Sequence, residues 1–381
     1  MRRRLVAALV AVLVAAGVVV GVVAWTRPDC TLTDMPFSST TTDASAPDLS
    51  PLGLTPGHMV AADRVVDVVS SPEADVVVSA REGGGGIVTG YDAASGVPRW
   101  SVAVPGAGVR IAVADGRVVG ATLADQARVF GLDAATGDHR FCAGLGAVDA
   151  PAALAPSSWA PVTLVGSTAV TAWTDVDGGP RIAAVDAVSG EERWNVEGRA
   201  RDLHPAGDAV LTGAGLRYDL ATGASSALGV EGSVAAADAG SAVLTDFRAD
   251  ALHVADARAG GLRWTAPLHG SGPDGGSVLA GGVVVTNDFV SPGLRGLDGA
   301  DGTELWRRAA DRLTGTSQRF LVADGDTVWA GGIGDLGRFD ARTSAGEVVA
   351  VRGLRGLSVS GDGRVVVRLA DRLVSYTPTA P

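Results

Sequence analysis

From residue 58 onward, the chain is a succession of short runs of β-branched and small apolar residues, separated by turns rich in Gly and Asp. A representative stretch is 111–132, which turns at Asp115 and Gly116 between two such runs. Beyond the first 25 residues no segment keeps a 3.6-residue hydrophobic period with helix caps. Four short strands in every period of about 40 residues are typical of β-propeller blades. The pattern therefore predicts an all-β propeller.

One sequence pattern recurs through this region: Asp, two small residues, Ser or Thr, Gly, and a Trp four residues later. The copies contain, in chain order, Asp92, Gly96 and Trp100; Asp133, Gly137 and Phe141; Asp186, Gly190 and Trp194; Asp219 and Gly223; Asp256, Gly260 and Trp264; Asp298, Gly302 and Trp306; and Asp340. The Asp carboxylate can accept bonds from the backbone of a tight turn, and Gly supplies a positive φ. We interpret these residues as turn formers and the Trp side chains as core; a stacking platform for a planar cofactor is the alternative for the Trp side chains.

The repeats also indicate the number of blades. Seven turns are visible, and three further strand-like runs follow the last of them, within residues 357–376. Their missing outer strand is expected from the start of the domain, near residues 59–63. If residues 58–377 are shared equally, eight blades take about 40 residues each and seven take about 46. The repeat spacing favours eight blades, with seven as the alternative.

The amino terminus predicts a membrane anchor. Residues 5–25 form an uncharged run of Ala, Val, Leu and Gly that is long enough to cross a bilayer as a helix. Because Arg2–Arg4 precede it, residues 1–4 are expected to be a cytoplasmic tip and the remainder extracytoplasmic. A cleaved signal peptide is the alternative. Residues 26–57, rich in Ser, Thr and Pro, are predicted to be an extracytoplasmic linker, and residues 58–381 the propeller.

Charge argues against one class of partner, and the cysteine content suggests a disulfide. The formal net charge is −11, and an acidic surface repels phosphate backbones, so nucleic-acid binding is not expected. The chain contains two cysteines, Cys30 and Cys142. Outside the cytoplasm such a pair can persist as a disulfide, which here would fasten the segment after the membrane to the propeller. Two unrelated thiols are the alternative.

The pattern Leu-Asp-x-x-Thr-Gly-x-x-x-Trp resembles the repeat of pyrroloquinoline-quinone (PQQ) propellers over residues 65–376. This resemblance implies the propeller fold and either of two functions: a quinoprotein dehydrogenase, or a non-enzymatic scaffold or binding module. The dehydrogenases of the family carry adjacent cysteines over the cofactor, a Ca²⁺ site and a catalytic Asp. This chain has no adjacent cysteines and is shorter than those enzymes, so the resemblance implies the non-enzymatic, membrane-anchored type without a cofactor.

Other motifs predict no catalytic, cofactor or metal site. Gly332–Gly337 matches a dinucleotide-binding fingerprint, but strand residues follow it where a helix is required, so a turn is predicted. Asp175, Asp177, Asp324 and Asp326 lack the ligand spacing of a calcium loop and are interpreted as turn formers. No histidine stands at metal-binding spacing from Cys or another His; the five are His58, His139, His204, His253 and His269.

Trp159 is the one aromatic residue singled out as a possible partner contact. The interval between the second and third turns is longer than its neighbours, and the excess falls in residues 150–161, an Ala- and Pro-rich stretch that contains Trp159. An aromatic side chain on a loop of a rigid scaffold suits partner binding; folding back onto the propeller is the alternative. Residues 82–86 and 288–293 are further loops that could join a binding face.

These observations predict a membrane-anchored, extracytoplasmic propeller that binds or scaffolds a protein or cell-envelope ligand through loops converging at the channel mouth. A PQQ-dependent oxidoreductase is the second hypothesis, and it would require an acidic, Asn-lined central pocket. A sensor domain is the third. With about four cytoplasmic residues, such a sensor would need a membrane partner to pass on a signal.

Overall fold

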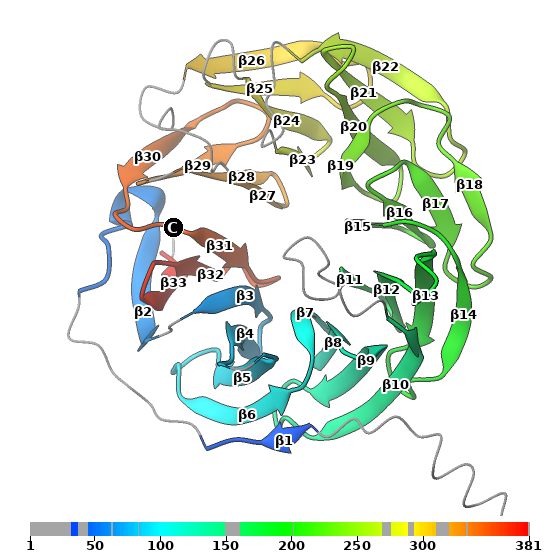
Figure 1. Ribbon diagram of the computed structural model, residues 1–381. Coiled ribbons are helices and arrows are strands. Elements are labelled where there is room, and N and C mark those ends of the chain that lie inside the picture. The colour runs from blue at the N-terminus through cyan, green and yellow to red at the C-terminus, as the bar shows by residue number, and fades with distance from the viewer. Residues whose placement is uncertain are drawn as a thin grey trace, which may run out of the picture.

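The computed structural model is a closed ring of eight β-sheets, each a blade, arranged around a central axis (Figure 1). The sequence prediction of an all-β, eight-bladed propeller is confirmed. Seven sheets have four strands and the first has five. The residues that the structure describes are 32–36, 45–61, 64–82, 84–148, 161–200, 202–268, 276–288, 293–309, 320–332 and 334–379.

Each blade is an antiparallel meander from an innermost to an outermost strand. The innermost strands are β3 (Val65–Ser70), β7 (Ala107–Ala114), β11 (Val162–Val165), β15 (Leu203–Ala206), β19 (Ser233–Ala237), β23 (Ser277–Ala280), β27 (Phe320–Asp324) and β31 (Gly356–Val359). Each contacts the innermost strand of the next blade, so together they surround the central axis, where propellers have their channel (Figure 1). The second strands are β4 (Ala74–Ala80), β8 (Arg117–Leu123), β12 (Thr168–Thr174), β16 (Ala209–Thr212), β20 (Ser241–Asp246), β24 (Val283–Asp288), β28 (Thr327–Gly331) and β32 (Val365–Arg368).

The third and fourth strands carry the sequence repeat. The third strands, which end at the repeat Asp in blades 1 to 7, are β5 (Gly86–Asp92), β9 (Gln126–Asp133), β13 (Pro180–Asp186), β17 (Leu216–Asp219), β21 (Ala251–Asp256), β25 (Gly293–Asp298), β29 (Asp335–Asp340) and β33 (Arg372–Pro378). The outermost strands are β6 (Pro98–Val104), β10 (His139–Ala147), β14 (Glu192–Glu197), β18 (Ser225–Ala227), β22 (Leu262–Pro267), β26 (Glu304–Ala309), β30 (Gly346–Ala350) and β2 (Leu54–Ala61).

The ring closes by joining the two ends of the described chain in blade 8. Strand β2 pairs with β33 as the outermost strand of that blade, with Met59 opposite Val374. In Figure 1 the two strands lie side by side although one is blue and the other red. This confirms the expected closure from residues near 59–63, although β2 begins earlier, at Leu54. Closure leaves the circle of blades without a free end.

The segment predicted as linker differs from the structure in its last part. A short 3₁₀ helix, η1 (Ser50–Leu52), precedes β2, and Leu49, Leu52 and Leu54 are buried among blade 7 and 8 residues. Tyr376 donates its hydroxyl to the carbonyl oxygen of Pro47 at 2.9 Å. The Ser and Pro content suggested a chain that buries little, but three leucines are enough to dock it against a core built from distant strands.

A second part of that segment extends blade 1. Strand β1 (Thr33–Asp34) pairs antiparallel with β6, which places Thr33 opposite Ala103 (Figure 1). The outer edge of a propeller blade is an unpaired strand edge, and such edges accept additional strands. Here the chain covers part of the edge of blade 1 with its own residues.

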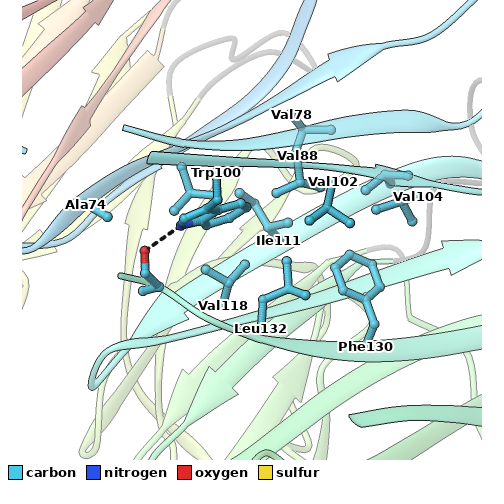
Figure 2. Close-up of a cluster of buried hydrophobic side chains, with 13 residues drawn as sticks. Ala74, Val78, Val88, Trp100, Val102, Val104, Ile111, Val118, Phe130 and Leu132 are labelled. Carbon is cyan, nitrogen blue, oxygen red and sulfur yellow. Dashed lines mark hydrogen bonds between the residues drawn. The ribbon is translucent and has the colours of Figure 1, made fainter. Parts of the chain in front are cut away.

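The core lies between the blades rather than inside any one of them. Between blades 1 and 2, Val78, Val88 and Val102 face Val118 and Leu132, with Trp100 at one end of the layer (Figure 2). Small β-branched side chains allow the sheets to stack closely. Each interface buries apolar surface from two blades, so no blade can bury its faces alone.

No helix among the described residues is long and apolar enough to cross a membrane. The predicted tip at residues 1–4 and the predicted membrane helix at residues 5–25 lie outside the described residues, so both remain predictions.

Candidate binding face

The repeat Asp residues form the turns between the third and fourth strands. At Asp186 one carboxylate oxygen accepts the backbone N–H groups of Val188 and Ser189, both at 2.9 Å. Gly190 then takes a φ of 74° and donates its N–H to the carbonyl of Asp186 at 2.8 Å. The same capping by the Asp side chain recurs at Asp92, Asp133, Asp219, Asp256, Asp298 and Asp340. The turns therefore satisfy their own backbone groups.

In several blades the second carboxylate oxygen binds an arginine seven residues later. Arg140, Arg193 and Arg263 each donate to their Asp at 2.6 Å, and Arg99 bonds Asp92 in the same way. The bond from Arg193, with the N–H groups of the turn, holds the pKa of Asp186 well below its usual value. In these blades one carboxylate oxygen is bound by the turn and the other by the arginine of the adjacent strand.

The repeat Trp residues connect neighbouring blades. Trp100 donates its indole N–H to the carbonyl of Ala134 in the next blade at 2.9 Å, the bond drawn in Figure 2. Trp194, Trp264 and Trp306 make the equivalent bonds to Leu220, Gly299 and Ala341. Each ring is packed between two blades, so these contacts support the core role of the Trp side chains and not the alternative, a stacking platform for a planar cofactor.

The two ends of the ring differ in the connections that they carry. In each blade, the first strand joins the second, and the third joins the fourth, at one end of the ring, which we call the turn end. The opposite end, where second strands join third strands and one blade joins the next, is the loop end. The turn end is made of tight turns occupied by their own hydrogen bonds. The loop end carries the longer connections, from Ala147 to Val162, from Pro267 to Ser277 and from Ala309 to Phe320. Loops on a rigid scaffold are where binding residues concentrate.

The loops singled out from the sequence all connect strands at the loop end. Residues 82–86 join β4 to β5, residues 150–161 lie between β10 and β11, and residues 288–293 join β24 to β25. The order of the strands in each blade puts all three segments at one end of the molecule, as a shared binding face requires. Trp159 and His269 lie outside the described residues, so a partner contact by Trp159 remains a prediction.

The remaining motifs fall in turns and strands. Gly337 lies inside β29, which pairs with β28, so residues 332–334 are a strand connection and no helix follows. Asp175 accepts the N–H groups of Asp177 and Gly179 at 3.1 and 2.8 Å, as expected of a turn former. Within the described part of the chain, no three His, Cys, Asp or Glu side chains are grouped as metal ligands.

The histidines have separate structural surroundings. The imidazole of His58 on β2 lies 3.5 Å from the carboxylate of Asp75, which is itself bound by Arg364. The ring of His253 bonds the hydroxyl of Thr265 at 2.9 Å. His204, on innermost strand β15, has a pKa lowered by burial, and its Nε2 atom has no hydrogen-bond partner.

Charged groups also lie at the channel mouth, and sequence reasoning did not identify them. Asp67 on β3 and Arg110 on β7 are 3.8 Å apart, with side chains 27% and 23% exposed. Burial raises the pKa of Asp67 in spite of Arg110 and Arg368 nearby, and burial lowers the pKa of Arg110. The available signal was an arginine between Val109 and Ile111 in an otherwise apolar strand.

The described innermost strands do not present the residues that a PQQ site would need. The chain contains two asparagines, Asn195 and Asn287, and these lie on β14 and β24 rather than on an innermost strand. The described innermost strands contribute two carboxylates, Asp67 and Asp324, which belong to opposite ends of their strands. An acidic, Asn-lined central pocket is therefore not formed by these strands.

Cys142 lies on outermost strand β10. Cys30 lies outside the described residues, so the pairing of Cys30 with Cys142 remains a prediction.

The repeated Asp turn, the interblade Trp bonds and the eight-bladed ring define a propeller of the PQQ-like class. A family profile described as outer membrane protein assembly factor BamB matches residues 42–195 and 178–356, and the chain belongs to this family. Among solved structures, BamB from Moraxella catarrhalis is similar, with a TM-score of 0.61 and 18% identity over 85% of this chain and 97% of that chain. Sqt1 from Saccharomyces cerevisiae is also similar, with a TM-score of 0.57 and 12% identity over 85% of this chain and 98% of that chain. A search of curated proteins gave no match.

Proposed function

We propose that this protein is a membrane-anchored, extracytoplasmic propeller that binds a protein or cell-envelope ligand at its loop end and serves as a scaffold. The difference between the two ends of the ring carries the proposal. At the turn end the repeat carboxylates are occupied by backbone N–H groups and arginines, as Asp186 is by Ser189 and Arg193. At the loop end the connections are unequal in length and include the three longest of the ring, which is the arrangement that supports recognition.

The family assignment is compatible with this proposal. The profile that matches the chain is described as an assembly factor. The similar solved propellers share less than 25% of their residues with this chain, so the similarity to them shows a common fold and not a common function. A function in assembly or partner binding is therefore proposed for this chain on its own geometry. The quinoprotein alternative has less support, because the innermost strands do not form the pocket that it requires.

The proposal includes a membrane anchor and a disulfide that would hold the propeller at the membrane surface. Residues 5–25 would hold the propeller at the outer side of a membrane, and β1 with a Cys30–Cys142 bridge would fasten the preceding segment to the rim of blades 1 and 2. Deletion of residues 5–25 is expected to release the protein from the membrane fraction. Protease added to intact cells should degrade the full-length protein if the propeller is extracytoplasmic.

Site-specific photocrosslinking in intact cells tests the binding face. A photoreactive amino acid replaces Phe247, which is 45% exposed in the β20–β21 loop at the loop end. The matched control replaces Val188, which is 56% exposed in a repeat turn at the turn end. A discrete adduct from position 247 that is missing from position 188 is the expected result. Adducts of equal yield at both positions would contradict a loop-end binding face.

Calorimetric titration of the full-length protein in detergent with PQQ, with and without Ca²⁺, tests the alternative function. No heat of binding is expected. Tight binding together with reduction of an electron-acceptor dye would replace the scaffold proposal by an oxidoreductase.

A further inference from the structure

The loop end carries an excess of arginine over blades 8, 1 and 2. Five arginines lie there in loops or at the strand ends beside them, and Arg110 lies within strand β7. We call this group of six the arginine mouth: Arg64, Arg81, Arg110, Arg352, Arg355 and Arg368. Its positive charge contrasts with a chain whose formal net charge is −11.

Two members of the arginine mouth are balanced by carboxylates. Arg64 pairs with Glu82 at 2.9 Å, and Arg110 with Asp67 at 3.8 Å. The other four make no ion pair with any carboxylate in the described part of the chain. Two neighbouring arginines add no net charge, because Arg128 pairs with Asp125 and Arg372 with Asp371.

Two guanidinium groups from different blades converge inside the mouth. Arg110 of blade 2 and Arg368 of blade 8 both donate to the carbonyl oxygen of Val66 in blade 1, at 3.3 and 3.1 Å. Arg368 donates a second bond to the carbonyl of Arg355 at 3.1 Å. Among the described residues, Asp67 is the carboxylate that interacts with both guanidinium groups, and its single charge cannot balance two. Arg368 keeps N–H donors beyond its bonds to these two carbonyls, and such donors can bind an anion.

The opposite side of the same end has the opposite charge. The loops of blades 3 to 5 carry more carboxylates than arginines among their described residues. The carboxylates are Asp175, Asp177, Asp202, Glu231, Asp246 and Asp250; the arginines are Arg199 and Arg248. The loop end is therefore polarised across the channel, basic on one side and acidic on the other.

We propose that the arginine mouth is the docking surface for a short acidic segment of a partner protein, whose Asp or Glu side chains pair with Arg355 and Arg368. The inference rests on the proposed function and names the chemistry of the partner. Charge complementarity supplies the recognition, since the carboxylate geometry matches the planar fork of arginine.

A short peptide segment fits the polarised end better than a long polyanion. A phosphate polymer laid across the channel would meet the carboxylates of blades 3 to 5, which repel it. A short acidic segment can contact the arginine mouth alone. Its remaining residues can lie against those innermost strands that carry no charged side chain, such as β11 and β31.

Fluorescence anisotropy with the full-length protein in detergent micelles tests this inference. The probe is fluorescein-labelled hexaglutamate, and hexalysine of the same length is the charge control. We expect hexaglutamate to bind at low ionic strength and the affinity to fall as salt is added. Arg355→Glu and Arg81→Glu should each weaken binding about tenfold. Both side chains are exposed, so neither change should prevent folding.

Arg248→Glu is the matched control, because Arg248 is exposed at the same end but on the acidic side. It should leave the affinity unchanged. Absence of hexaglutamate binding to the unmodified protein, or equal loss in all three variants, would overturn the inference. Binding of hexametaphosphate with none of hexaglutamate would also overturn it and would identify a phosphate polymer as the ligand.

Comparison with the crosslinking experiment separates the two proposals. An adduct from position 247 without hexaglutamate binding would refute the arginine mouth and keep the loop-end binding face. A second crosslinking position at Glu82, whose side chain is 82% exposed beside Arg64, covers the basic side of the loop end. Hexaglutamate binding that depends on Arg355, without an adduct from position 82 or position 247, would keep the anion site and refute the scaffold function.

Discussion

The indole N–H of Trp100 donates to the backbone carbonyl of Ala134 at 2.9 Å, across the interface between blades 1 and 2. Trp100 is 5% exposed, and the glycine of the next repeat turn, Gly137, lies directly against its ring. One repeat therefore supplies the ring, and the following repeat supplies both the acceptor and the space. This relationship explains why the Asp, Gly and Trp of the pattern recur together.

Replacing Trp100 should destabilise the propeller in two steps. Trp100→Phe keeps a ring but leaves the Ala134 carbonyl without its donor, which should lower the free energy of unfolding by ~1–3 kcal/mol. Trp100→Ala also removes the packing and should lower it by ~3–5 kcal/mol. Urea unfolding followed by circular dichroism measures both. Phe247→Ala, at an exposed loop position, is the control and should change little; similar values for all three variants would contradict the role of the bond.

Gly137→Ala should be more damaging than the same change at Gly116. Both glycines have positive φ values, 75° and 69°. A Cβ at Gly137 would lie 2.6 Å from Cγ of Trp100, whereas nothing lies within 4 Å at Gly116. The Gly116 variant should lose ~1–2 kcal/mol for the left-handed backbone alone. The Gly137 variant should lose more, because the ring has to move as well. Equal losses in thermal or urea unfolding would show that the turn glycine is needed only for its backbone conformation.

The contact between the first and last blades should be sensitive to a single charge. Arg364 donates to both carboxylate oxygens of Asp75 at 2.7 Å, and their side chains are 6% and 4% exposed. Asp75→Asn leaves a buried guanidinium without its counter-charge and should cost ~3–5 kcal/mol of unfolding free energy. Asp371→Asn breaks the exposed pair with Arg372 and should cost less than ~1 kcal/mol. A small effect of Asp75→Asn in the same unfolding assay would mean that ring closure depends mainly on strands β2 and β33.

Acid should weaken the repeat turns. The pKa of Asp92 is lowered to about 2, mainly by the Ser95 hydroxyl and N–H, and those of Asp186 and Asp256 are lowered as well. A carboxylate with a lowered folded pKa stabilises the fold above its unfolded value and loses that contribution as the pH falls through the folded value. Stability should therefore decline below a pH of about 4.

Arg193→Gln tests the cause of this acid sensitivity. The change should raise the pKa of Asp186, because the guanidinium bond to its carboxylate is lost. Carboxyl carbon chemical shifts followed by NMR as a function of pH report the titration directly. Asp340, whose carboxylate is bound by Thr343 instead of an arginine, serves as the internal control. An unchanged titration of Asp186 would exclude Arg193 as the main cause.

Much of the fold could be predicted from the sequence because the repeat is local. The Asp, Gly and Trp positions mark the third strand, the turn and the fourth strand of most blades, and their period gives the blade count. The boundary of the domain was harder to predict. Leu49 and Leu52 stand among Ser and Pro, and their burial depends on Tyr376 and Trp329, which are hundreds of residues away.

The candidate site was less predictable than the fold. The sequence suggested that residues 82–86, 150–161 and 288–293 could contribute to one binding face, but only the order of the strands in each blade assigns them to the loop end. The arginine mouth was missed because its members come from blades 8, 1 and 2. No local pattern relates Arg110 to Arg368, and only the closed ring brings both to the carbonyl of Val66.

The class of fold and the internal structure of each repeat follow from local sequence, since turns and strand periodicity depend on neighbours a few residues apart. The surfaces that the ring creates depend on its closure in three dimensions. Closure of the ring by β2 and β33 sets the relative position of every blade. Charges separated by hundreds of residues then lie within a few ångströms, and their sum, rather than any single residue, gives the loop end its basic and acidic sides.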